Sequence, residues 1–168
     1  MVQEFKTIGN IKFDPKAIRD PSGKMFKEWW VIVELDKNEI IDYYNWFMKR
    51  EFGIKLQRPA FGPHVSLIRG EEINKEKWDI GKEKWDGTQV NIKYWSPPRT
   101  NGKHWWLRLS NEDEILDIRE DIGYVRQGAW ILHLTIGMPI PNDLEQSKYI
   151  WKLYKKNLLN YPYYTNTI

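Results

Sequence analysis

The strongest signal in the chain is the stretch Phe61-Gly-Pro-His64-Val-Ser66-Leu-Ile-Arg69-Gly70, which is echoed by Trp130-Ile-Leu-His133-Leu-Thr135-Ile-Gly137. Each stretch is a mostly apolar run that ends at glycine, which is typical of a buried β-strand. Each carries a histidine followed two residues later by a hydroxyl side chain. Residues two apart on a strand point to the same face, so we expect each histidine and its hydroxyl to emerge together.

A single histidine on a strand is more often a structural residue than a catalytic one. Two copies in matching settings favour a function, because the chain has only three histidines. Two imidazoles that face each other across a cleft suit general acid–base catalysis, since their ordinary pKa of about 6.5 allows both protonation states near neutral pH. The hydroxyl groups of Ser66 and Thr135 are suited to hold the non-bridging oxygens of a phosphate.

This pair of His-x-Ser/Thr motifs, in a small chain without cysteine, resembles the 2H phosphoesterase superfamily. Within it, the size, the motif spacing and the many aromatic residues are most similar to the phage anti-CBASS nucleases. The resemblance implies a bilobal α+β fold, in which two small antiparallel sheets with backing helices surround a central cleft. It implies that His64, Ser66, His133 and Thr135 are the catalytic residues and that no metal ion or other cofactor takes part.

The resemblance also implies a reaction, the hydrolysis of 3′–5′ linkages in cyclic di- or trinucleotides such as 3′,3′-cGAMP, which counteracts bacterial CBASS immunity. The nucleophile would be the neighbouring ribose 2′-hydroxyl, or water for a 2′,3′-cyclic phosphate. One imidazole would take a proton from the nucleophile and the other would protonate the leaving oxygen, while the hydroxyls stabilise the developing charge. The motifs are nearly symmetric, so the sequence does not assign acid and base.

Composition restricts the other possibilities. The 168 residues are expected to form one domain, residues 1–168, and a net charge of +3 suits a small anionic ligand better than a long nucleic acid. The chain has no cysteine and no histidines at ligand spacing, which argues against a metal centre. No signal-peptide core or membrane-length apolar run occurs in the sequence, so we expect a cytoplasmic protein, in the host cell if it is encoded by a phage.

Turn residues divide the chain into alternating strands and helices, with no linker between them. Besides the two motifs, strands are expected at residues 5–13, 29–35, 88–95 and 103–109. Helices are expected to begin at the caps Asp36, Ser110 and Asn142 and to end near Gly53, Gly123 and Leu158. Residues 71–87 are expected to form a short surface helix and loop. Gly9 is expected to mark a bulge, and Ser96 to end a strand.

Aromatic residues exceed what a core of this size requires, since there are ten tryptophans and nine tyrosines. A base stacked on such a ring contributes about 1–3 kcal/mol with little sequence selectivity. The candidate ligand-binding residues are Tyr94, Trp95, Lys103, Trp105, Trp106, Tyr163 and Tyr164. Trp105 and Trp106 face opposite sides of a strand, so only one of them can face the cleft. By the same alternation Arg69 should point away from His64, and His104 is expected to be structural or exposed.

Two other functions remain open at this point. A 2H enzyme that acts on RNA 2′,3′-cyclic ends, like a tRNA ligase, would share the motifs but prefer a longer RNA. A non-catalytic module that sequesters nucleotides on its aromatic surface would tolerate the loss of both histidines. Which cyclic nucleotide is preferred, and the oligomeric state, do not follow from the sequence.

Overall fold

The computed structural model describes residues 2–16, 28–35, 38–126, 128 and 130–156. Within these residues the chain forms seven β-strands and four α-helices. The strands are β1 (Gln3–Phe13), β2 (Trp30–Leu35), β3 (Leu56–Gln57), β4 (His64–Arg69), β5 (Gln89–Thr100), β6 (Trp105–Leu109) and β7 (His133–Pro139). The helices are α1 (Asn38–Phe52), α2 (Lys75–Trp85), α3 (Glu112–Asp121) and α4 (Leu144–Lys155), with a 3₁₀ turn (Pro141–Asp143) before α4.

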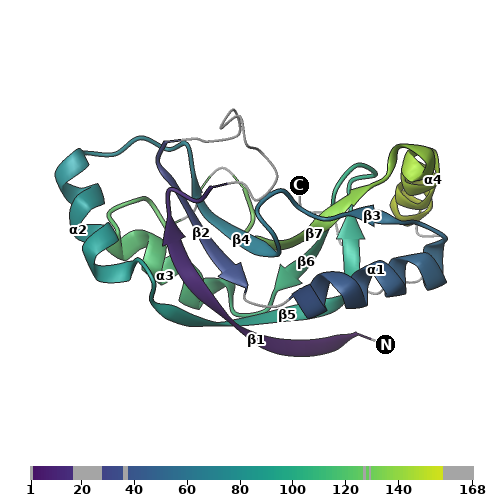
Figure 1. The fold of residues 1–168 in the computed structure, drawn as a ribbon, viewed down its shortest axis with the longest axis horizontal. Coiled ribbons are helices and arrows are strands. Elements are labelled where there is room, and N and C mark those ends of the chain that lie inside the picture. Colours follow the sequence, from purple (N-terminus) through teal and green to yellow (C-terminus); the bar gives the residue numbers. More distant parts are fainter. Residues whose placement is uncertain (1, 17–27, 36–37, 127, 129, 157–168) are drawn as a thin grey trace.

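The strands form one antiparallel sheet in the order β3-β7-β4-β2-β1-β5-β6. Because β6 also pairs with β7, six of these strands close into a barrel (Figure 1). The α+β class is confirmed. The prediction of two small sheets is wrong, because the strands of the described residues form a single sheet that closes on itself. The two motif strands, β4 and β7, are hydrogen-bonded neighbours in it although they lie far apart in the sequence.

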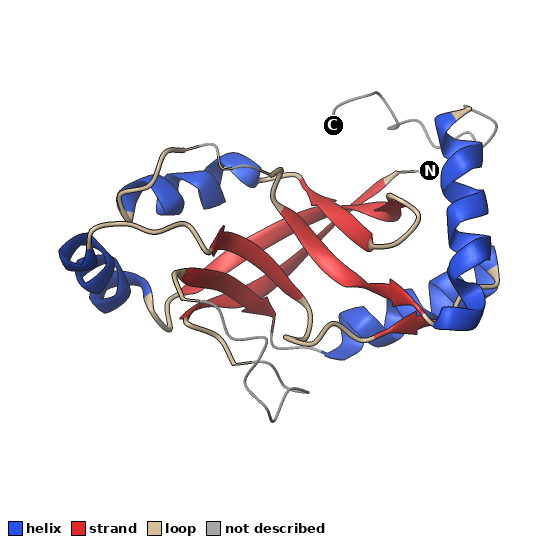
Figure 2. Ribbon diagram, turned by 90° about the horizontal axis from the view of Figure 1, so that it is seen from above, coloured by secondary structure: helices blue, strands red, loops and turns tan. Residues whose placement is uncertain are grey.

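One face of the sheet carries the hydrophobic core. Alternate strand residues are fully buried there, as the two-residue period of a strand requires: Val31, Val33, Val65, Leu107 and Leu134. The helices contribute to the same core, α2 and α3 at one end of the sheet and α1 and α4 at the other (Figures 1 and 2). None of the helices among the described residues is long and apolar enough to cross a membrane.

Two strand predictions are wrong. The pairing of β1 with β2 and β5 continues through Gly9 without a bulge. A Cβ atom at Gly9 would lie 2.5 Å from Cγ1 of Val33, so glycine is needed there for close packing. β5 does not stop at Ser96, because it continues to Thr100 with an irregularity in its pairing to β6 between Trp95 and Arg99.

Two helix caps also differ from the prediction. α3 is preceded by Asn111 instead of Ser110, and α4 by Asp143 instead of Asn142. The Asn111 side chain does not cap its helix, because it accepts a hydrogen bond from one backbone amide of β5 and donates to a carbonyl of the same strand. The predicted cap Asp36 lies outside the described residues.

Candidate active site

The two motif histidines lie on neighbouring strands and share one face of the sheet. Backbone pairing puts His64 of β4 opposite Thr135 of β7. The apolar residues next to them on each strand are fully buried in the core, so His64, Ser66, His133 and Thr135 occupy the opposite face, which we call the histidine face. Diagonal neighbours on paired strands lie about 7–8 Å apart, which allows both imidazoles to contact one phosphate group.

Both imidazoles are held in the same tautomer by the backbone. Nδ1 of His64 lies 2.8 Å from the carbonyl oxygen of Gly62, and Nδ1 of His133 lies 2.8 Å from that of Ile131. A carbonyl oxygen only accepts hydrogen bonds, so Nδ1 carries the proton in each ring. In each neutral ring Nε2 is therefore an acceptor that can take up a proton from a bound molecule.

Burial makes both histidines weaker bases than usual. Burial lowers the pKa of His64 to about 4. The charges of His133 and Arg69 lower this pKa further, whereas the hydrogen bond to the Gly62 carbonyl raises it in part. Burial also lowers the pKa of His133, again opposed by its backbone hydrogen bond. His64 is buried and His133 is half-buried. Both rings are therefore neutral at pH 7 in the free protein.

The third histidine lies near this pair. His104 is exposed and directly precedes β6. Its pKa is lowered by partial burial and by the charges of Lys103, His133 and Arg69. His104 therefore shares the electrostatic surroundings of the motif histidines without being part of a motif strand.

Arg69 lies on the histidine face, so the prediction that it points away is wrong. The pairing of β2 with β4 shifts by one residue at Leu67, and this bulge reverses the alternation of side chains after it. Arg69 is consequently paired with Trp30, and its guanidinium lies 5.3 Å from the centre of that ring. Its positive charge lowers the pKa of both His64 and His133.

A buried arginine of α3 holds this bulge in place. Arg119, only 1% exposed, donates from Nη1 to the carbonyl of Leu67 at 2.9 Å and from Nε to the carbonyl of Val125 at 2.8 Å. It also forms an ion pair with Glu71, which follows β4. One cation therefore ties β4 to α3 and to the segment that leads into β7.

Backbone pairing continues the histidine face across β6 and β5, because opposed residues of antiparallel strands share a face. One row of opposed residues consists of His64, Thr135, Trp106 and Arg99. A second row consists of His133, Arg108 and Trp95. The rings of Trp106 and His133 lie 5.6 Å apart, centre to centre. Sequence analysis missed Arg99 and Arg108, although the spacing of two between Trp106 and Arg108 already places them on one face.

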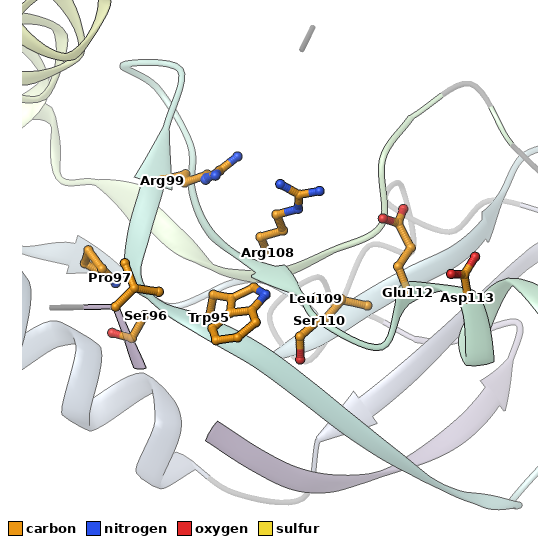
Figure 3. Close-up of a pocket in the computed structure, with 10 residues that line it drawn as sticks. Trp95, Ser96, Pro97, Arg99, Arg108, Leu109, Ser110, Glu112 and Asp113 are labelled. Atoms are coloured by element: carbon orange, nitrogen blue, oxygen red, sulfur yellow. The ribbon is translucent and has the colours of Figure 1, made fainter. Parts of the chain in front are cut away.

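A cavity of about 330 Å³ adjoins this face, lined by β5, β6 and the first turn of α3 (Figure 3). Arg99 and Arg108 project to the same side of the two strands, and Trp95 lies beside them (Figure 3). Glu112 lines the cavity and accepts a hydrogen bond from the amide of Leu132 at 3.0 Å, just before β7. The cavity is thus connected to the strand that carries His133.

Two of the predicted base platforms are core residues instead. Tyr94 stacks on Phe5 with ring centres 5.8 Å apart. Trp105 is fully buried and donates from Nε1 to Oγ of Ser147 at 2.9 Å. Both rings lie on the core side of their strands, away from the histidine face.

The remaining candidates differ in accessibility. Trp106 is half-buried on the histidine face, and Trp95 is 39% exposed in the cavity. Lys103 is exposed in the turn before β6. Tyr163 and Tyr164 lie outside the described residues. Among the predicted aromatic residues that the structure describes, Trp95 and Trp106 are therefore the two that can contact a ligand beside the histidines.

No family model, curated protein or solved structure matches this chain. In the parts of the chain that the structure describes, no three His, Asp or Glu side chains gather as a metal-binding group. The function is therefore inferred from the geometry of the histidine face.

Proposed function

We propose that this protein is a metal-independent phosphodiesterase that uses His64 and His133 as a general acid–base pair, as in the 2H phosphoesterases that it resembles. The observation that best supports this is the equivalence of the two imidazoles. They share a face on neighbouring strands, and each bonds through Nδ1 to the carbonyl two residues earlier. The grouping of helices at the two ends of the sheet is compatible with the bilobal arrangement of that superfamily (Figure 1).

The proposed first step cleaves a 3′–5′ linkage. The ribose 2′-oxygen attacks the neighbouring phosphorus while its proton passes to Nε2 of one imidazole. The bond from phosphorus to the 5′-oxygen breaks, and that oxygen takes a proton from the other imidazole. The products are a 2′,3′-cyclic phosphate and a free 5′-hydroxyl, and water can then open the cyclic phosphate with the two roles exchanged.

We assign His64 as the base of the first step and His133 as the acid. The pKa of about 4 keeps His64 neutral and ready to accept a proton. The His133 ring is more exposed, and the negative charge of a bound phosphate favours its protonation. Both proton transfers are then provided by the imidazoles, so the scheme requires no metal ion.

The charge that develops on the phosphoryl oxygens requires hydrogen-bond donors. The Ser66 and Thr135 hydroxyls emerge on the same face as the histidines. The guanidinium of Arg69 is close enough to influence the pKa of both imidazoles. These three groups are the proposed stabilisers of the transition state.

As substrate we propose a cyclic di- or trinucleotide, and as biological role the removal of such signals, which would counteract CBASS immunity. The accessible rings of Trp95 and Trp106 offer stacking surfaces for bases next to the histidines. The net charge of +3 and a cavity of about 330 Å³ suit a compact anionic ligand. A long RNA would require an extended basic surface.

The test is to incubate the protein with cyclic di- and trinucleotides and with RNA that ends in a 2′,3′-cyclic phosphate, with EDTA present throughout. We expect cleavage of a cyclic dinucleotide to a linear product with a 2′,3′-cyclic or open phosphate end, identified by mass spectrometry. Much faster cleavage of RNA ends would favour the RNA-end enzyme. Tight binding without cleavage would favour the sequestering module, and activity that returns only with added Mg²⁺ or Mn²⁺ would exclude the scheme.

A further inference from the structure

The cavity beside the histidine face presents two guanidinium groups to one region of space. Arg99 projects from β5 and Arg108 from β6, to the same side of the two strands (Figure 3). Arg108 lies directly opposite His133 in the backbone pairing. A phosphate between the two side chains can accept hydrogen bonds from both guanidinium groups.

The acidic residues of the same cavity are engaged elsewhere. Glu112 accepts the hydrogen bond from the Leu132 amide, and Asp113 forms an ion pair with Arg126 at 3.1 Å. Arg108 is exposed and forms no ion pair with any residue that the structure describes. Its charge is therefore available to a ligand.

The spacing between the two groups of side chains suits one nucleotide unit. The histidines lie on β4 and β7, and the arginines lie on the next two strands, β6 and β5. The centres of the two pairs are thus two strand spacings apart, about 9–10 Å along the sheet. Side chains that reach toward each other over this span can hold two phosphates separated by one nucleoside.

We propose that Arg99 and Arg108 form a second phosphate subsite, which holds the phosphate next to the scissile one while Trp95 stacks on a base. The planar guanidinium groups can each donate two hydrogen bonds to phosphate oxygens. This inference rests on the proposed function and narrows its substrate class. A ligand with two phosphates one nucleoside apart occupies both the histidine site and the arginine subsite. A cyclic mononucleotide occupies only the histidine site, so the enzyme binds it more weakly.

The experiment compares Arg108→Ala and Arg99→Ala with the wild type on two substrates. One is the cyclic dinucleotide 3′,3′-cGAMP and the other is 2′,3′-cyclic AMP. We expect each variant to raise the Michaelis constant for the dinucleotide by about 10-fold or more, whereas kcat/KM for the mononucleotide changes by less than about 2-fold. Arg108→Lys should recover only part of the loss, because lysine keeps the charge but not the bidentate geometry.

Arg50→Ala is the matched control, because it removes one exposed positive charge from α1, away from the cavity. Arg50→Ala should leave the kinetic constants for both substrates unchanged. An equal loss on both substrates, or a loss in Arg50→Ala as large as in Arg108→Ala, would overturn the subsite in favour of a general effect of charge.

A binding measurement separates this proposal from the proposed function. Calorimetry with 3′,3′-cGAMP is performed on His64→Ala, and on the same variant with Arg108→Ala added. We expect the added change to weaken binding about 10-fold even if no hydrolysis is ever observed. Unchanged binding, or no binding to either protein, overturns the subsite. Weakened binding together with an inactive wild type overturns only the catalytic proposal.

Discussion

β4 and β7 carry the same short motif in two different environments. Each imidazole bonds through Nδ1 to the carbonyl two residues earlier, at the same distance of 2.8 Å. His64, however, is buried beside the ring of Phe61, whereas His133 is half-buried beside Trp106. The backbone sets the tautomer identically in both strands, and the surroundings set the two proton affinities separately.

In the proposed mechanism, this difference allows a nearly symmetric pair to divide the roles of acid and base. The more deeply buried ring resists protonation more strongly, since desolvation disfavours the charged form. The more exposed ring gains a proton at a lower cost when an anionic ligand arrives. Repetition in the sequence therefore identifies the pair, and the packing around each member is the basis of the proposed assignment of base and acid.

The largest expected effect comes from removing either ring. His64→Ala and His133→Ala should each lower kcat by about 10²–10⁴-fold on a cyclic dinucleotide, because each proton transfer loses its partner. Circular dichroism and melting temperature check that the variants fold. His104→Ala is the matched control, a histidine in the same electrostatic surroundings, and should lose less than about 3-fold. If one motif histidine can be replaced with little loss, the strands are not a catalytic pair.

The next effect is on stability in acid. The pKa of His64 is about 4 when folded and about 6.5 when unfolded, so below pH 6.5 only the unfolded chain takes up this proton. The free energy of unfolding should therefore decrease as the pH falls from 6.5 to 4, by up to roughly 3 kcal/mol from this residue. His133 should also lower the free energy of unfolding as the pH falls, but by less, since it is less buried.

Proton NMR titration of the two rings measures this directly, and urea unfolding between pH 7 and 4 measures the linkage. His64→Gln should remove more of the pH dependence of stability than His133→Gln does. A His64 ring that titrates near 6.5 would remove the asymmetry between the strands and with it the assignment of His64 as the base.

Local patterns in the sequence were sufficient for the motif strands and for their shared faces. The spacing of two on each strand predicts that His64 emerges with Ser66 and His133 with Thr135. Alternation could not tell which face is the core, and therefore Trp105 was proposed as a ligand platform although it is buried.

The pairing between strands could not be predicted in the same way. Arg99 and Arg108 are placed beside the histidines by the register of β5, β6 and β7, which depends on contacts between distant parts of the chain. Arg69 was predicted on the wrong face because the bulge at Leu67 is held by Arg119, and no local pattern marks it.

An intermediate effect is expected for the hydroxyl groups. Ser66→Ala and Thr135→Ala should each lower kcat by about 10- to 10²-fold, since each removes one donor to the phosphoryl oxygens. The loss should be larger at Thr135, which lies directly opposite His64 in the pairing. Thr135→Ser and Ser66→Thr keep the hydroxyl and should retain most of the activity. Full activity in both alanine variants would show that the two hydroxyl groups do not contribute to catalysis and that only the histidines do.

The smallest expected effect tests the cause of the asymmetry, the aromatic neighbour of each ring. The ring of Phe61 lies 6.0 Å from that of His64, and Trp106 lies 5.6 Å from His133. Phe61→Leu should admit water around His64 and raise its pKa by about one unit or less, because desolvation is the main cause of its low value. Trp106→Leu should raise the pKa of His133 by a smaller amount, since that ring is already half-exposed.

Each variant should shift mainly the pKa of the histidine next to the substituted ring. NMR titration of both histidines in both variants measures this. Leucine is chosen over alanine because Phe61 packs on Trp30 and Ile32, and a large cavity there would destabilise the fold. Trp95→Leu serves as the control, because it removes an aromatic ring from the cavity without touching either imidazole environment. If Phe61→Leu leaves the pKa of His64 unchanged while Trp106→Leu, which makes His133 easier to protonate, lowers it, the difference between the strands arises from charge across the pair and not from burial at each ring.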